Sequence, residues 1–116
     1  MEPIVIALWM TLAGGFGAVI RFFIAQWQGK LPWGILAANM LGSFILGAYY
    51  INDAPEVWLI VAALTGGIST FSSVAANTWQ FVTLKLRLRA FLNLLLNFAL
   101  PYTAAFAGLA ADLLIR

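Results

Sequence analysis

The most concentrated polar chemistry in this sequence lies in the stretch LTGGISTFSSV, residues 64–74. Two adjacent glycines, Gly66 and Gly67, each lower helix stability by about 1 kcal/mol relative to alanine. Four hydroxyl residues follow them: Ser69, Thr70, Ser72 and Ser73. A helix interrupted at 66–69 would expose carbonyls that can hold a cation and amides that favour an anion. The stretch predicts such a break or, alternatively, a glycine packing notch with hydroxyls bonded to the preceding turn.

Other polar side chains lie within long apolar segments. Asn39, Ser43 and Gly47 recur every four residues and therefore share one face of a helix. Small residues at this spacing let helices approach closely, so Ser43 and Gly47 are interpreted as packing residues. Asn39 needs a hydrogen-bond partner, either another helix or a passing ligand. Arg21 either extends to the membrane interface or attracts an anion.

The composition indicates a membrane protein. The chain has 116 residues, of which 64% are hydrophobic and 9% charged, and its mean hydropathy is +0.98. Soluble domains carry about 25% charged residues. The chain has no cysteine and no histidine, which excludes disulfides, thiolate metal sites and histidine catalysis. Six scattered basic residues form no nucleic-acid footprint, and neither an enzyme nor a cleavable signal peptide is expected.

Uncharged stretches define the expected membrane spans. A helix needs about 20 apolar residues to cross a bilayer, and a charge within hydrocarbon costs several kcal/mol. Four stretches meet this requirement: 3–20, 31–52, 57–84 and 90–111. The sequence predicts an all-α membrane protein, one domain over 1–116 with four transmembrane helices. The third stretch is longer than one span needs, so it tilts or is broken near residues 66–70.

The connecting segments carry opposite charges at the two ends of the spans. One side holds four acidic residues and one basic residue: Glu2, Asp53, Glu56, Asp112 and Arg116. The other side holds four basic residues and no acid: Lys30, Lys85, Arg87 and Arg89. Because lysine and arginine stay cytoplasmic, both termini are predicted to lie outside the cell membrane.

Three motifs resemble the Fluc or CrcB family of small fluoride channels. GGFGAVIRF (14–22) matches the glycine–arginine pattern of the first helix of that family, and NMLGSFILG (39–47) matches the asparagine and glycines of the second. GGISTFSS (66–73) is similar to the third-helix signature. The motifs fall in the family's order and the resemblance covers nearly the whole chain, although the fourth helix matches only loosely, through Tyr102 and Gly108.

The resemblance implies an antiparallel, dual-topology dimer of four-helix subunits and passive export of cytoplasmic fluoride, which reduces fluoride toxicity. A structural sodium ion at the dimer centre would be held by the backbone carbonyls of Gly66 and Ser69. The implied fluoride pathway comprises Asn39, Phe71, Thr70, Ser72, Ser73 and Arg21. Amide and hydroxyl donors and the positive edges of aromatic rings can replace the water that fluoride loses.

Several positions depart from the family pattern. Val74 stands where the family has a second phenylalanine, Ile35 where it usually has a threonine, and Asn77 where it often has a glutamate. Phe106 and Ala110 replace the hydroxyls usual in the fourth helix. Part of the expected pore lining is therefore inert. The resemblance implies two fluoride pores beside the sodium ion, and only one of them is expected to conduct.

The unequal loop charges favour a single orientation, which suggests a homologous, oppositely oriented partner subunit. Two alternatives remain open at this point. One is a non-conducting structural subunit of a heterodimeric channel. The other is a small multidrug-type exporter, which is less favoured because residues 3–27 contain no membrane-embedded carboxylate.

Overall fold

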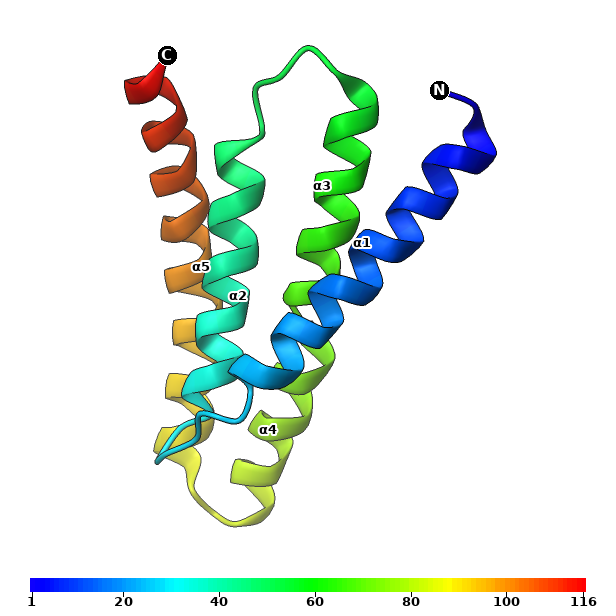
Figure 1. Cartoon of the computed structure of the whole chain (residues 1–116). Helices are drawn as coiled ribbons and strands as arrows, with labels where there is room; N and C mark the ends of the chain where they lie inside the picture. Colours follow the sequence, from blue (N-terminus) through cyan, green and yellow to red (C-terminus); the bar gives the residue numbers. More distant parts are fainter.

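The chain folds entirely into helices. The computed structural model describes all residues from 1 to 116. The helices are α1 (Pro3–Ile24), α2 (Trp33–Ala48), α3 (Pro55–Ile68), α4 (Phe71–Thr83) and α5 (Arg87–Ile115). Together α3 and α4 cover one long apolar segment, so the chain forms four helical segments, and the predicted all-α fold is confirmed (Figure 1). Three of them are long and apolar enough to span a membrane, whereas α2 has only 16 residues.

The helix ends differ from the predicted ones where local chemistry sets them. Helix α2 stops at Ala48 rather than continuing to residue 52. In the following loop, Asn52 Nδ2 donates to the Tyr49 carbonyl at 2.7 Å, and its Oδ1 accepts from the Ala54 amide at 3.0 Å. These bonds hold a turn. Pro55 then occupies the first position of α3, where its missing amide hydrogen costs nothing.

Both chain ends and the loop between α2 and α3 lie at one end of the molecule (Figure 1). The amino group of Met1 pairs with Glu56 Oε1 at 2.9 Å, and Arg116 donates to the carbonyl of Ile51. The first contact ties the N-terminus to the first turn of α3, and the second ties the C-terminus to the loop between α2 and α3. The predicted grouping of the termini with this loop is confirmed.

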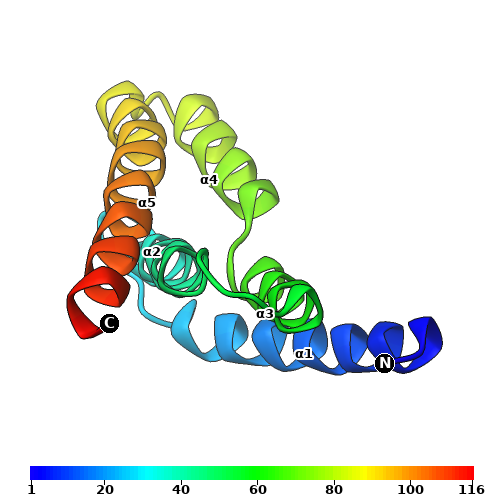
Figure 2. The ribbon, with the colours of Figure 1, turned by 90° about the horizontal axis from the view of Figure 1, so that it is seen from above.

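The helices pack as two close pairs, α1 with α3 and α2 with α5 (Figure 2). A Cβ atom on Gly67 would overlap the carbonyl oxygen of Gly14 in α1, and one on Gly47 would overlap that of Ala105 in α5. Such close backbone approach explains why glycine is needed at these positions. The packing interpretation of Gly47 is confirmed.

Helix α4 leaves the line of α3 and leans toward α5 (Figure 2). Val74 of α4 and Asn93 of α5 are each only 2% exposed, and they lie where these two helices meet. Ile68, at the end of α3, is 1% exposed. Buried residues therefore flank the bend between α3 and α4, with Ile68 before it and Val74 after it. This packing positions the polar residues of the break.

Candidate functional site: a helix break held by asparagines

The third membrane segment is broken at Ser69 and Thr70. Both residues have extended backbone, with φ/ψ of −82°/154° and −152°/123°. The break lies within the predicted range 66–70, but Gly66 and Gly67 are still helical. The two alternatives are therefore not exclusive: the helix is broken, and Gly67 also packs closely against the backbone of α1.

A buried asparagine holds the break open. The Thr70 amide donates to Asn39 Oδ1 at 2.6 Å, and Asn39 Nδ2 donates to the Thr70 carbonyl at 3.2 Å. In a continuous helix the Thr70 amide would instead donate to the Gly66 carbonyl. The Asn39 side chain, which is 7% exposed, thus replaces helical hydrogen bonds with bonds to α2.

The break leaves backbone carbonyls at the end of α3 without helical partners. Neither the Gly66 nor the Ser69 carbonyl accepts a hydrogen bond within the chain. An unpaired carbonyl is costly within a membrane span. These are the carbonyls that the resemblance assigns to a sodium ion, and free oxygen acceptors fit such a hard cation.

The hydroxyls around the break fall into two groups. Thr70 Oγ1 accepts from the Ser73 amide at 3.2 Å, which caps the N-terminus of α4. The same oxygen lies 3.2 Å from Ser72 Oγ and 3.3 Å from Ser73 Oγ. Ser69 Oγ instead donates to the Thr65 carbonyl at 2.8 Å. Only Ser69 of these four hydroxyl residues therefore bonds to the preceding turn. The hydroxyls of Thr70, Ser72 and Ser73 form one cluster.

Two asparagines of α5 extend this network. Asn39 Nδ2 also donates to Asn97 Oδ1 at 2.9 Å, and Asn97 Nδ2 donates to the Asn93 carbonyl at 2.8 Å. Asn93 Nδ2 donates in turn to Thr78 Oγ1 of α4 at 2.9 Å. The sequence interpretation missed both α5 residues. Their signal is the segment NLLLN, residues 93–97, in which two amides one helical turn apart interrupt an apolar span.

A cavity of about 240 Å³ opens beside the break. It is lined by Asn39, Ser43, Ser69, Thr70, Phe71, Val74, Asn97, Phe98 and Pro101. None of these side chains is charged. Phe71 is 66% exposed, and its ring centroid lies 6.2 Å from that of Phe98. The cavity thus combines amides, hydroxyls and aromatic rings, a set of groups that can solvate a small ion without carrying a net charge.

Residues 8–109 match the model of the family described as CrcB-like protein, Camphor Resistance (CrcB). The chain belongs to the CrcB-like family. It is 38% identical to a protein of a Nitratiruptor species named fluoride-specific ion channel FluC, over 84% of each chain. It is 32% identical to proteins of the same name from Hahella chejuensis, over 93% of this chain and 94% of the relative, and Magnetococcus marinus, over 92% and 97%.

In this CrcB-like chain, the cavity brings together only some of the residues predicted for a fluoride pathway. Asn39, Thr70 and Phe71 line it, whereas Ser72 and Ser73 do not line it and instead contact Thr70 Oγ1 with their hydroxyls. Arg21 does not line it and lies in the last turn of α1.

The departures from the family pattern lie in different surroundings. Val74 is buried and lines the cavity, and Ile35 is buried in α2 without lining it. Phe106 borders a separate apolar cavity together with Gly47 and Tyr50. Ser43, interpreted as a packing residue, lines the polar cavity instead.

Proposed function

We propose that this chain is a subunit of a fluoride-selective channel that allows cytoplasmic fluoride to leave the cell passively. The observation that carries the proposal is the uncharged polar cavity at the helix break, in a chain whose relatives are named fluoride-specific ion channels. Its groups suit ion passage rather than chemical catalysis.

The hydrogen bonds at the break indicate which residues position the backbone and which can face the ion. Both amide hydrogens of Asn39 are occupied by Asn97 and the Thr70 carbonyl, so Asn39 positions the break in this conformation. The hydroxyl of Ser72 and the exposed ring of Phe71, whose edge is positive, remain as groups that can face an anion, whereas the Thr70 hydroxyl donates to Ser73 Oγ. A fluoride ion would exchange water for these donors as it passes the break.

A sodium ion would bind the backbone carbonyls that the break leaves unpaired. Each chain offers the two unpaired carbonyls of Gly66 and Ser69, fewer than the six or so oxygen ligands common for hard cations such as calcium. A second subunit that presents the same break would double the ligand set. The expected result of replacing sodium with a large organic cation is a lower unfolding temperature of the assembled protein, while an unchanged temperature would contradict a structural sodium.

The proposed assembly is an antiparallel dimer. Polar groups at the break face an open cavity, and exposed polar groups within a membrane span need a protein partner. Lys30, Lys85 and Arg89 belong to an end of the molecule without acids, so we infer one orientation in the cell membrane, with the termini outside. The partner would then be a homologous subunit of opposite orientation.

Fluoride efflux from proteoliposomes tests the function directly. The purified chain is compared with Asn39→Asp and Phe71→Ile, and chloride efflux serves as the selectivity control. Asn39→Asp places an anionic group that cannot donate to Asn97 or Thr70, and Phe71→Ile removes the ring edge. Fluoride-selective efflux that is lost in both variants would support a homodimeric channel.

If the folded chain alone is silent, the assay is repeated with a homologous subunit. Efflux that appears only in the mixture and is lost with Phe71→Ile supports a heterodimeric channel to which this chain contributes a pore. Efflux that is unaffected by Phe71→Ile and Asn39→Asp would instead identify this chain as a structural subunit. Val74 is buried at a position where the family has a pore phenylalanine, and this observation favours the structural subunit as the second candidate function.

A further inference from the structure

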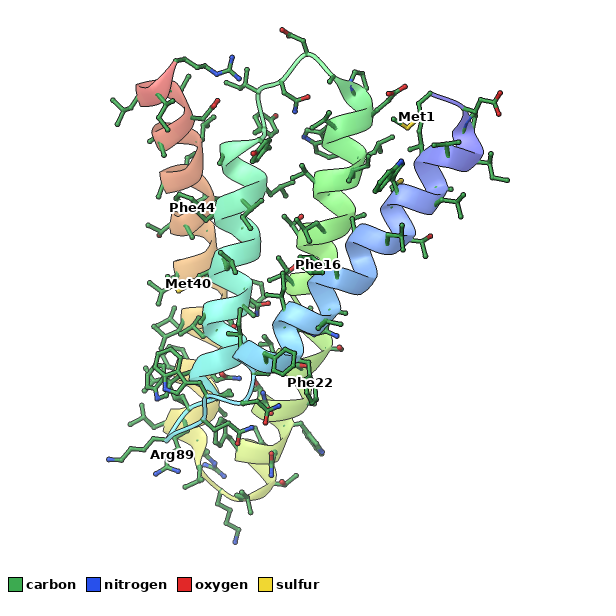
Figure 3. The ribbon with its side chains drawn as sticks, in the orientation of Figure 1. Met1, Phe16, Phe22, Met40, Phe44 and Arg89 are labelled. Carbon is green, nitrogen blue, oxygen red and sulfur yellow. The ribbon has the colours of Figure 1, made fainter.

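A second polar cavity, of about 260 Å³, lies at the end of the molecule opposite the termini. It is formed by the loop between α1 and α2, the end of α4 and the start of α5. Its lining includes Gln28, Lys30, Asn77, Gln80, Leu84 and Arg89. Arg89 is seen at the base of the molecule, beside the loop that joins α1 and α2 (Figure 3).

The charge of this cavity is not compensated within the chain. Lys30 and Arg89 line it, and no acidic residue does. Both ion pairs of the chain, Met1 with Glu56 and Arg116 with Asp112, involve residues near the opposite end. Arg89 also lies in the first turn of α5, where the helix dipole is already positive and a cation is unfavourable. An anion bound here would relieve both effects.

The hydrogen-bonding groups of the cavity are free as well. The side chains of Gln28, Asn77 and Gln80 make no hydrogen bond within the chain, and neither do those of Lys30 and Arg89. This contrasts with the asparagines at the helix break, whose amides are all paired. Five side chains with N–H donors therefore border one cavity without a partner, which suits a ligand with several acceptor oxygens.

The position of the cavity points to a lipid as the source of that ligand. It lies where the spans end, and apolar residues border it: Leu84 is 60% exposed, beside the less exposed Phe81 and Leu86. Trp27, 62% exposed, adjoins the loop and is typical of the membrane interface. We propose that this cavity binds the phosphate group of an anionic phospholipid, with Lys30 and Arg89 as its charged ligands. This proposal does not depend on fluoride permeation.

Native mass spectrometry of the detergent-solubilised chain tests the site, with phosphatidylglycerol as the probe and phosphatidylcholine as the neutral comparison. The chain should retain phosphatidylglycerol preferentially. The double variant Lys30→Gln/Arg89→Gln should weaken its binding at least about tenfold, since each cation near an anionic lipid contributes about 1 kcal/mol. The conservative variant Arg89→Lys should retain most of the binding.

A matched control separates this site from general attraction. Lys85→Gln/Arg87→Gln removes the same charge at the same end, but neither residue lines the cavity. Equal weakening in both double variants would overturn the proposal, as would unaltered binding in Lys30→Gln/Arg89→Gln. Displacement of the lipid by inorganic phosphate at equal concentration would show a free-anion site and overturn the lipid assignment. Circular dichroism of each variant verifies that it is folded.

Discussion

At the scale of single residues, Asn39 shows how one amide can hold a break in a membrane helix. Its oxygen accepts from the Thr70 amide, and its nitrogen donates to the Thr70 carbonyl and to Asn97. All three contacts require one orientation of the side chain. Asn97 accepts from Asn39 while donating to Asn93, and thereby fixes that orientation.

We therefore expect Asn97→Leu to destabilise the chain by about 1–2 kcal/mol, because it removes the acceptor for Asn39 and leaves an amide hydrogen unpaired near mid-span. Thr103→Val is the control, since that hydroxyl is exposed and bonds only to the preceding turn of its own helix. Unfolding in mixed detergent micelles measures both. A loss no larger than that of Thr103→Val would contradict the positioning role of Asn97.

The candidate site was only partly predictable from residue types. Asn39, Thr70 and Phe71 stand out because polar and aromatic residues cluster there, and the structure brings them around one cavity. The part played by Asn97 was missed. Its contact with Asn39 depends on how α5 packs against α2, a long-range relation that the spacing within one span does not reveal.

At the scale of helices, the N-terminal cap of α4 predicts that two substitutions of Thr70 lower stability by different amounts. Thr70→Val removes the hydroxyl that accepts from the Ser73 amide and should cost about 1 kcal/mol of stability. Thr70→Ser keeps that acceptor and should cost much less. In the efflux assay we expect the valine variant to be slower and the serine variant near the unaltered rate. Equal stability of the two variants would rule out the cap as a contributor.

The pairing of α1 with α3 predicts opposite outcomes for two glycines. Gly67→Val must push the two helices apart, because its side chain would overlap the Gly14 backbone, and should cost about 1–3 kcal/mol. Gly15→Ala has open space around it and should be neutral or slightly stabilising. Thermal unfolding of the two variants makes the comparison. Similar midpoints would show that this contact is looser than its geometry indicates.

The helices themselves were largely predictable, because charges and prolines mark the ends of apolar spans. Less predictable was the place of the break. The glycines drew attention to 66–69, whereas the extended residues are Ser69 and Thr70. Intrinsic helix propensity favours a break at Gly66 and Gly67. The close approach of α1 and the bonds from Asn39 override that preference, and neither is local in sequence.

At the scale of the whole molecule, the charge distribution sets the expected assembly. Lys30, Lys85, Arg87 and Arg89 lie in or beside the two segments at one end, and the acidic residues lie toward the other. A chain that forms an antiparallel homodimer must insert in both orientations. Loops that differ strongly in positive charge favour a single orientation. The orientation in the membrane therefore decides between a homodimer and a heterodimer.

Because the chain has no cysteine, an introduced one reports orientation without interference. We expect Ala54→Cys to react with an impermeant maleimide in intact cells and Gln28→Cys to react only after permeabilisation. Replacing Lys85 and Arg87 with glutamine and Asp53 with lysine reduces the charge difference, so a fraction of Gln28→Cys should then react in intact cells. Equal labelling of Ala54→Cys and Gln28→Cys in intact cells, with the loop charges unaltered, would demonstrate dual orientation. A homodimer would then be possible, and the inferred need for a homologous partner would be withdrawn.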